Sequence, residues 1–243
     1  MSSGDALLAT RGLALRAAGR TLVADLAWTV GAGERWCVIG RNGSGKSLLL
    51  RALAGLPVPE RAGEILWQGR AQSAWPVGAA AAARAHVPQQ AQDRFALVVE
   101  RLLALSEGAL AVRRAALLDA LDIAHLAPRR ADRLSGGERQ RVALAQCAVQ
   151  GAALALLDEP VSFQDPAHQQ LVGRWLVGAP PARAWIASAH DPTWIGRVAT
   201  HVLALFGDGR WQAGPAGDVL RADVLERTYG CAWRSVEGAW LPA

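Results

Sequence analysis

Short apolar runs separated by turn-forming residues predict a small antiparallel sheet at the start of the chain. Turn signals at Arg11-Gly12, Ala18-Gly19 and Gly31-Ala32-Gly33 divide residues 6–39 into such runs. Glycine-bounded runs of this length are typical of β-strands. The last run, residues 35–39, is apolar after its first residue and predicts a strand that leads into a glycine-rich segment.

The middle of the chain changes to helical periods. A strand with a following turn is expected at residues 63–69, and the alanine-rich stretch 78–85 then predicts a short helix that ends at Val87-Pro88-Gln89-Gln90. Apolar positions recur at helical spacing through residues 95–128, and Pro128-Arg129-Arg130 ends that region. Helices are therefore expected to dominate this part of the chain.

Strands and helices alternate in the last third of the chain. A helix is expected after Ser135-Gly136-Gly137, and residues 152–206 then alternate apolar runs with helical stretches, as βαβ units do. Turn residues at Gly214-Pro215 precede a short helix expected near residues 219–227. The pattern predicts an α/β fold, and a length of 243 residues suits one domain with or without an inserted subdomain.

Composition excludes several classes of protein. Hydrophobic residues make up 51% of the chain, enough for a buried core, yet no apolar stretch is long enough for a transmembrane helix. The first five residues do not resemble a secretory signal. Five tryptophans fall in apolar runs and are expected in the core: Trp28, Trp36, Trp67, Trp175 and Trp185.

The cysteine content and the net charge limit the compartment and the kind of surface that are expected. Cys37, Cys147 and Cys231 are far apart and odd in number, which argues for a reducing compartment and against a disulfide frame or a zinc site. The net charge of +5 fits a solvated surface rich in arginine. No basic run is interleaved with aromatic residues, as a nucleic-acid platform would require.

The chain contains one lysine, Lys46, within Gly40-Arg41-Asn42-Gly43-Ser44-Gly45-Lys46-Ser47. This G-x-x-x-x-G-K-[ST] spacing is that of the phosphate-binding P-loop. The glycines let main-chain N–H groups point at phosphate oxygens, and a helix that begins near Gly45 presents its positive end to them. Lys46 is expected to reach the β- and γ-phosphates, and Ser47 to ligate Mg²⁺.

Two acidic residues follow a predicted strand. The apolar residues 153–157 end in Asp158-Glu159-Pro160. Ligands of α/β sheets bind at the carboxyl ends of the strands, so we expect both carboxylates beside the P-loop. Asp158 is expected to hold Mg²⁺, and Glu159 to orient or deprotonate an attacking water.

A third segment, Leu134-Ser135-Gly136-Gly137-Glu138-Arg139-Gln140, narrows the class. A serine cap with two glycines at a helix start makes an anion site, but capping alone does not account for the paired glycines followed by Glu-Arg-Gln. With the P-loop before it and ALALLDEP (153–160) after it, this segment resembles the ATP-binding subunit of ABC transporters over about residues 8–235.

The resemblance implies an architecture and a reaction. It implies a P-loop (RecA-like) core of residues 1–88 and 151–243, with an N-terminal antiparallel β subdomain and an inserted α-helical subdomain at about 89–150. Two copies would pack head to tail around two ATP molecules, which are hydrolysed to ADP and phosphate. The P-loop of one copy and Ser135, Gly136 and Gly137 of the other would hold each ATP.

Three further residues match the family's pattern. Gln89, with Gln90 as its neighbour, resembles the Q-loop glutamine that contacts Mg²⁺ or the attacking water. His190, which follows the apolar run 184–189, resembles the switch histidine that contacts the γ-phosphate. Asp165 resembles the aspartate of the D-loop, which crosses the dimer interface.

Three positions depart from that pattern. Phe163 and Gln164 stand between the serine and the aspartate of the D-loop, where the family has a small residue and a leucine. Residues 15–20 contain no aromatic residue to stack on adenine, so Arg16 or Arg20 stacks instead or base recognition is weaker. Leu48 replaces a threonine after Ser47, with little effect expected.

Residues 87–97 and 225–238 resemble importers for cobalamin, iron-siderophores and haem, with cobalamin favoured. The family implies multi-span permease subunits, an extracytoplasmic solute-binding protein as an indirect partner, no nucleic acid, and a peripheral location at the cytoplasmic face of the membrane. A soluble ABC ATPase in DNA repair or translation, or an exporter subunit, stays open. The chain shows neither a long coiled coil nor a second cassette, and the extension beyond about residue 210 speaks against an exporter.

Overall fold

The computed structural model describes residues 6–90, 97–105, 114–180 and 182–243. Part of the helical region expected at 95–128 lies outside these residues, and so do Phe95 and Ala96 from the segment that resembles chelate importers. The fold class predicted from the sequence, mixed α/β, is confirmed. The division into a core and an inserted subdomain stays a prediction.

A six-stranded sheet forms the centre of the molecule, with the strand order β10-β9-β3-β8-β7-β6. Neighbouring strands are parallel throughout, except that β10 runs antiparallel to β9. The carboxyl ends of the parallel strands therefore share one edge of the sheet. The bounds are β3 Arg35–Ile39, β6 Arg84–Val87, β7 Leu154–Leu157, β8 Ala184–Ser188, β9 His201–Leu205 and β10 Trp211–Pro215.

The N-terminal antiparallel sheet is present, but its first two strands are longer than expected. Its order is β2-β1-β4-β5, with β1 Ala6–Ala17, β2 Arg20–Gly31, β4 Glu60–Trp67 and β5 Arg70–Ala71. The turn predicted at Arg11-Gly12 is wrong, because β1 continues through it with a register shift between Thr10 and Leu13. A bulge supplies the extra residue without ending the strand.

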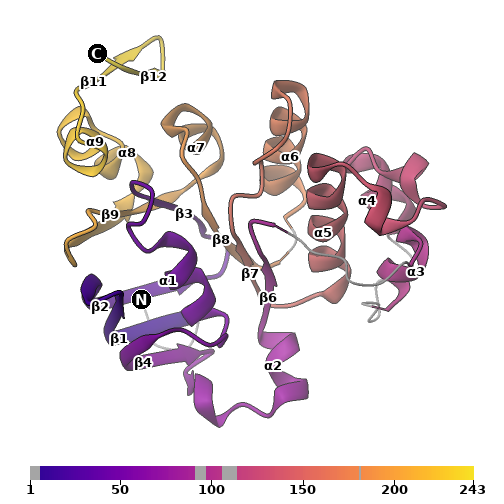
Figure 1. The fold of residues 1–243 in the computed structure, drawn as a ribbon, viewed down its shortest axis with the longest axis horizontal. Coiled ribbons are helices and arrows are strands. Elements are labelled where there is room, and N and C mark those ends of the chain that lie inside the picture. Colours follow the sequence, from indigo (N-terminus) through magenta and orange to yellow (C-terminus); the bar gives the residue numbers. More distant parts are fainter. Residues whose placement is uncertain (1–5, 91–96, 106–113, 181) are drawn as a thin grey trace.

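Helices cover both faces of the central sheet (Figure 1). They are α1 Lys46–Leu53, α2 Val77–Ala83, α3 Val99–Ala104, α4 Arg114–Ala120, α5 Gly136–Gln150, α6 Pro166–Gly178, α7 Pro192–Val198, α8 Ala216–Val219 and α9 Ala222–Tyr229. Single 3₁₀ turns occupy Gln72–Ala74, Ala124–Leu126 and Ala131–Arg133. The helices expected after Gly45, near 78–85, after the 135–137 segment and near 219–227 are confirmed.

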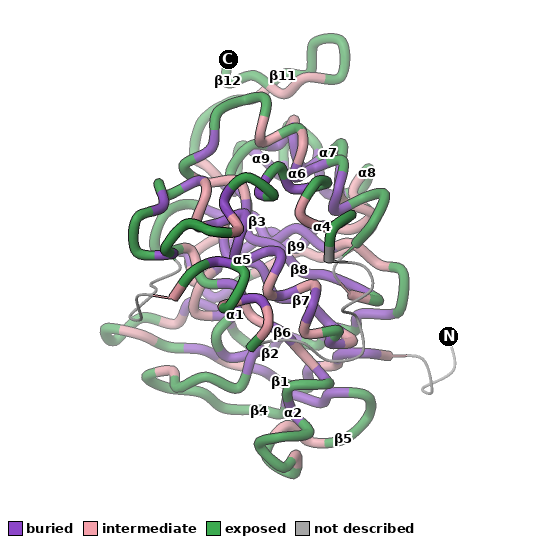
Figure 2. The backbone as a smooth tube through the Cα atoms, turned by 90° about the vertical axis from the view of Figure 1, so that its right-hand side faces the viewer, coloured by how far each residue is buried: buried purple, intermediate pink, exposed green. Residues whose placement is uncertain are grey.

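Side chains alternate across the central sheet and divide the core into two clusters. Trp36 and Val38 pack with Leu50 of α1 and with the N-terminal sheet. Cys37 and Ile39 pack on the other face, in the cluster that holds residues of α5, α6 and α7. Successive residues of a strand point to opposite faces, so α1 and α5 are separated by the sheet. Figure 2 shows the buried strands at the centre of the molecule.

The tryptophans and the last residues of the chain were treated differently by the sequence: the first were predicted and the second were not. The five tryptophans expected in the core are all buried, from 0% exposed at Trp185 to 5% at Trp175. A hairpin that the sequence did not predict, β11 Trp233–Val236 and β12 Ala239–Pro242, follows α9. Among the described residues, no helix combines the length and apolar character needed to cross a bilayer.

Candidate nucleotide-hydrolysis site

The P-loop lies between β3 and α1, as the sequence predicted. A Cβ atom on Gly40 would lie 2.3 Å from the hydroxyl of Ser44 and 2.8 Å from the carbonyl oxygen of Leu205, so only glycine fits. The hydroxyl of Ser44 is buried and has no hydrogen-bond partner among the described residues. A buried polar atom without a partner is costly, and a bound phosphate oxygen would satisfy it.

Lys46 is turned toward the loop and is only 6% exposed. Its ammonium donates to the carbonyl oxygen of Gly40 over 2.8 Å and to that of Arg41 over 3.2 Å. Burial lowers the pKa of Lys46, while the charges of Glu159 and Asp158 oppose this shift. The single lysine and both predicted carboxylates therefore lie within electrostatic reach of one another.

Glu159 is the centre of the site, because its carboxylate contacts residues of two distant segments and a serine of its own turn. The amide of Gln89 donates to Oε2 over 2.9 Å, and the hydroxyl of Ser162 donates to the same oxygen over 2.7 Å. Nε2 of His190 lies 2.7 Å from Oε1. Two residues predicted from sequence, Gln89 and His190, are thus brought to the predicted catalytic carboxylate across more than thirty residues of chain.

The environment of Glu159 keeps its carboxylate ionised. Burial acts to raise the pKa of Glu159, but the hydrogen bonds from Ser162 and His190 and the charge of Lys46 hold it below the usual value. The residue also adopts a left-handed backbone, with φ of 48°. Such strain in a residue without glycine's freedom is typical of functional sites.

Asp158 is fixed by a residue that sequence reasoning missed. The hydroxyl of Ser188, at the end of β8, donates to Oδ1 of Asp158 over 2.6 Å and accepts the main-chain N–H of Glu159 over 2.8 Å. Ser188 is fully buried. The one signal in the sequence was a hydroxyl in an otherwise apolar strand, just before His190.

The residues predicted to ligate Mg²⁺ are Ser47, Gln89 and Asp158. The described residues contain no group of three or more histidines, cysteines, aspartates or glutamates that would hold a metal by themselves. Mg²⁺ in nucleotide sites needs only one or two protein oxygens, because phosphates and waters complete its shell. Asp158 and Ser47, at the end of β7 and in the first turn of α1, fit that requirement, and the third predicted ligand, Gln89, contacts Glu159, the residue after Asp158.

The second glycine-rich segment begins α5, on the other face of the sheet from α1. Ser135 caps the helix: its hydroxyl accepts the N–H of Glu138 over 3.3 Å, and the Glu138 carboxylate accepts the N–H of Ser135 over 2.7 Å. Ser135 and Gly136 are exposed and Gly137 is buried. The sheet therefore separates these predicted ATP contacts from the P-loop of the same chain.

The unusual D-loop packs against this helix start. Phe163 has a φ of 63°, its side chain is 62% exposed, and its carbonyl oxygen lies 2.8 Å from where a Cβ on Gly137 would be. Asp165 caps α6. Its carboxylate accepts the main-chain N–H of His168 over 3.0 Å and lies 2.8 Å from Nδ1 of the His168 ring. Among the described residues, the Asp165 carboxylate bonds to His168 and to no residue of the P-loop.

The two arginines considered for adenine stacking have different surroundings. The guanidinium of Arg16 lies 3.7 Å from the carboxylate of Glu60, on the N-terminal sheet. Arg20 donates to the carbonyl oxygen of Gly207 over 3.3 Å. A Cβ on Gly207 would lie 3.8 Å from the Cβ of Ser44, so Arg20 is the arginine whose anchor adjoins the P-loop.

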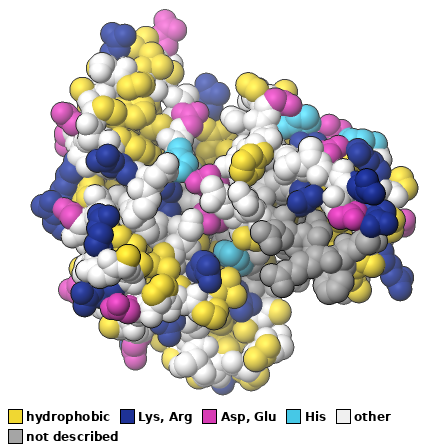
Figure 3. All heavy atoms as spheres, in the orientation of Figure 1, with side chains coloured by type: hydrophobic (Ala, Val, Ile, Leu, Met, Phe, Trp, Pro, Cys, Tyr) yellow, Lys and Arg dark blue, Asp and Glu magenta, His cyan; other side chains and the backbone are white. Residues whose placement is uncertain are grey.

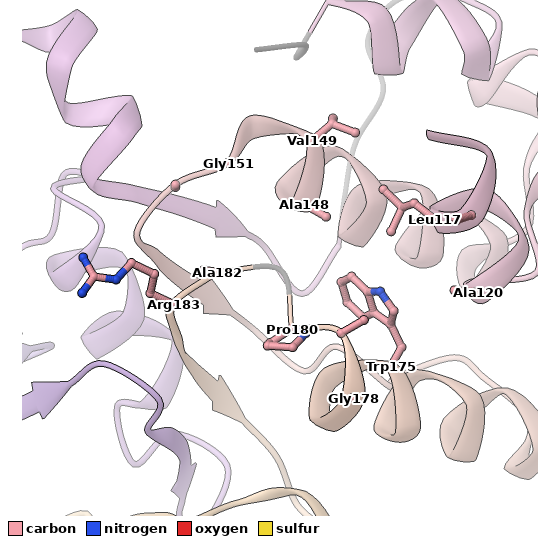
Figure 4. Close-up of a pocket in the computed structure, with 13 residues that line it drawn as sticks. Leu117, Ala120, Ala148, Val149, Gly151, Trp175, Gly178, Pro180, Ala182 and Arg183 are labelled. Carbon is pink, nitrogen blue, oxygen red and sulfur yellow. The ribbon is translucent and has the colours of Figure 1, made fainter. Parts of the chain in front are cut away.

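Two pockets differ in their relation to this site. One of about 170 Å³ is lined by Glu159, Ser162, Ser188 and His190 among others. A larger one of about 710 Å³ lies between α4, the C-terminal end of α5 and the end of α6, beside Leu117, Val149 and Trp175 (Figure 4). The larger pocket contains none of the residues predicted to act on a nucleotide, whereas Glu159 and His190 line the smaller one.

Charged side chains of both signs are interspersed over the face seen in Figure 3. The sequence predicted such an arginine-rich, mixed surface. On this face, basic side chains lie among acidic and uncharged ones.

Comparison with known proteins agrees on one family. A family model described as "ABC transporter" matches residues 23–162. A hemin import ATP-binding protein, HmuV, of Streptomyces coelicolor is 36% identical over 237 residues, which are 93% of this chain and 84% of that protein. The protein of the same name in Bordetella pertussis is 35% identical over 242 residues, 92% of each chain.

Solved structures share the fold. A metal-chelate type ABC transporter in an inward-facing conformation has a TM-score of 0.78 at 23% identity, with 98% of both chains covered. An ATP-bound exporter of the Atm1 family also reaches 0.78, at 24% identity, over 93% of this chain and 42% of that one. At these identities the likeness shows the fold alone, which transporters of opposite direction have in common.

Proposed function

The chain belongs to the ABC transporter family as an ATP-hydrolysing subunit, and from this premise we propose that it powers the import of haem or a closely related metal chelate. The observation that carries the catalytic part is the convergence of Gln89, Ser162 and His190 on Glu159. The observation that carries the solute is the name of the relatives that match most of the chain at 35–36% identity.

Glu159 is proposed as the residue that orients and deprotonates the attacking water. Its depressed pKa leaves it ionised and able to accept a proton at neutral pH. Nε2 of His190 lies 2.7 Å from Oε1 of Glu159, and the imidazole would stand between this carboxylate and the γ-phosphate. Gln89 reaches the same carboxylate from the end of β6, where it would report the state of the site to a membrane partner.

The P-loop supplies the charge stabilisation. Lys46, the buried hydroxyl of Ser44 and the main-chain N–H groups of residues 40–47 would hold the phosphates. Ser47, Asp158 and Gln89 would hold Mg²⁺, which when bound neutralises charge on the transferred phosphoryl group. Arg20 is the proposed base-stacking residue in preference to Arg16, because its anchor at Gly207 adjoins the loop.

A second copy of the chain would complete each site. The opposite placement of α1 and α5 on the central sheet supports the expectation that Ser135, Gly136 and Gly137 contact a partner's nucleotide and not the one held by their own P-loop. Head-to-tail packing of two copies would allow this contact, with the exposed N-terminus of α5 facing the partner's nucleotide. Asp165, which precedes α6, would lie at that interface.

Haem is proposed ahead of cobalamin, the solute favoured from sequence alone, because the named relatives import hemin. Multi-span permease subunits and an extracytoplasmic solute-binding protein would complete the transporter, with this subunit bound at the cytoplasmic face of the membrane.

The test is a pull-down of Glu159→Gln protein, tagged at its N-terminus, with ATP from detergent-solubilised host membranes. A multi-span permease identified by mass spectrometry supports the transporter, and loss of growth on haem iron after deletion of the gene supports the solute. Exclusively soluble or ribosomal partners would overturn the transport function. Growth on haem iron that is unaffected, with cobalamin uptake lost, would restore the cobalamin assignment.

A further inference from the structure

A side chain near the C-terminus, that of Tyr229, contacts the main chain of the nucleotide-hydrolysis site. Tyr229, the one tyrosine in the sequence, ends α9 and is half-buried. Its hydroxyl donates to the main-chain carbonyl oxygen of His190 over 3.4 Å. Burial, followed by the charge of Asp191, raises the pKa of Tyr229, while a hydrogen bond with the main chain of Gly40 works against that rise.

The end of α9 lies beside two segments that the proposed chemistry needs. Gly40 opens the P-loop, and His190 carries the imidazole that contacts Glu159. The next residue of the chain, Gly230, lies beside the P-loop as well, because a Cβ there would be 3.4 Å from the guanidinium of Arg41. The end of α9 thus adjoins both walls of the site.

The hairpin β11–β12 also contacts the segment that follows His190. The main-chain N–H of Trp240 donates to the hydroxyl of Thr193 over 2.9 Å, and Thr193 begins α7 just after His190. The rings of Tyr229 and Trp233 pack with their centroids 5.4 Å apart, which joins the hairpin to the end of α9. Figure 1 shows α9 and the hairpin at the same end of the molecule as α7.

We propose that Tyr229 is a positioning residue for ATP hydrolysis, whose hydroxyl ties the main chain of His190 to the end of α9, beside the Arg41 side chain of the P-loop. The inference rests on the proposed roles of Glu159 and His190. The phenol touches no reacting atom. It sets where the imidazole stands over the carboxylate, and it makes the C-terminal segment part of the catalytic apparatus. An O–H···O contact of 3.4 Å is longer than usual, so the effect is modest.

The test compares two hydroxyl deletions in adjacent residues of α9. Tyr229→Phe removes the oxygen that reaches His190. Thr228→Val removes a buried hydroxyl that bonds only to the carbonyl oxygen of Val224 in the same helix. With the full chain at one fixed concentration, Tyr229→Phe should lower kcat about two- to fivefold with KM for ATP unchanged, the size of an ordinary hydrogen bond. Thr228→Val should leave both constants unchanged.

A double-mutant cycle tests the route of the effect. Phosphate released over hours gives the residual rate of His190→Ala, and adding Tyr229→Phe to that variant should cause no further loss, because the phenol acts through residue 190. Unchanged kcat in Tyr229→Phe, an equal loss in Thr228→Val, or additive losses in the cycle would overturn the inference. Failure of the wild-type chain to hydrolyse ATP, or full activity of Glu159→Gln, would instead overturn the proposed function.

Discussion

The hydroxyl of Ser188 donates a 2.6 Å hydrogen bond to Oδ1 of Asp158, although thirty residues separate the two in the chain. The same hydroxyl accepts the N–H of Glu159. One buried serine therefore fixes both the proposed magnesium ligand and the backbone of the proposed base. A substitution at Ser188 thus disturbs both residues and leaves both carboxylates in place.

Ser188→Ala should lower kcat roughly tenfold and raise the Mg²⁺ concentration needed for half-maximal activity, because a misplaced group costs rate steeply. Removing a hydrogen bond to a charged group should also cost about 1.5 to 3 kcal/mol of unfolding free energy. Urea unfolding and ATPase assays over a magnesium series measure both. The exposed Ser73→Ala variant serves as the control, and a Ser188→Ala enzyme that matches it would remove Ser188 from this role.

Glu159→Gln should bind ATP but turn over at least about a hundredfold more slowly, since the amide keeps the shape of the side chain but cannot accept a proton. Binding is measured by equilibrium titration with a fluorescent ATP analogue, and turnover by phosphate release. The variant should also form a longer-lived dimer with ATP in size-exclusion chromatography. Near-normal turnover would contradict the assignment of Glu159 as the catalytic carboxylate.

Lys46 gives a direct readout of nucleotide binding, because it is the one lysine in the sequence. Burial lowers its pKa, so at pH 8 a larger fraction of the amine is neutral than for an exposed lysine. Labelling by an amine-reactive ester, followed by mass spectrometry, should slow about tenfold in saturating ATP and magnesium by steric cover and charge pairing. Labelling of the α-amino group is the internal control, and equal slowing of both amines would refute a specific effect.

Gly137 and Gly136 should respond differently to the same substitution. A Cβ on Gly137 would approach the carbonyl oxygen of Phe163 to 2.8 Å, so Gly137→Ala must displace the D-loop and should cost about 1 to 3 kcal/mol. A Cβ on Gly136 meets the Phe163 side chain at an ordinary 3.4 Å, and alanine favours the helix by up to about 1 kcal/mol. Urea unfolding of the two variants checks the contrast, and equal losses would show that Phe163 does not press on α5.

Stability should fall on the acid side through carboxylates that cap helices. The main-chain N–H of Ser135 is the largest cause that holds the pKa of Glu138 below its usual 4.5, and burial only partly opposes it. A group whose pKa is depressed by folding stabilises the fold above its unfolded pKa, and this stability is lost as pH falls through the folded value. The Tm should therefore be level from pH 7 to about 5 and fall below about 4.5. Glu138→Gln should make that acid limb shallower, whereas an unchanged limb would exclude Glu138 from it.

The local chemistry of the site was readable from the sequence because it rests on short-range rules. The P-loop spacing predicted the strand, the loop and the helix at 46–53, and the serine before two glycines predicted the cap of α5. Parallel strands put Asp158 and His190 at one edge of the sheet, as expected. The P-loop, the strand end at Asp158 and the helix cap required only periodicity, glycine and the polarity of a helix end, whereas His190 was predicted from the resemblance to a known family.

The remaining contacts could not be predicted because they depend on tertiary packing. Nothing in the sequence indicated that Ser188 would bond two residues of another strand end, or that Tyr229 would reach His190. The strand β6 was read as the end of a helix, since four residues carry too weak a pattern to be recognised alone. The bulge at Gly12 was read as a turn because both features use glycine.

The strand order has a consequence for how the protein is made. The P-loop strand β3, residues 35–39, is flanked in the sheet by β8 and β9, which lie some 150 residues later in the chain. A nascent chain that has emerged as far as the end of α6 therefore has no partner on either side of the strand that carries its nucleotide loop. Synthesis must be nearly complete before β3 has both of its neighbours, and until then its unpaired main-chain edges and apolar side chains are open to misassociation.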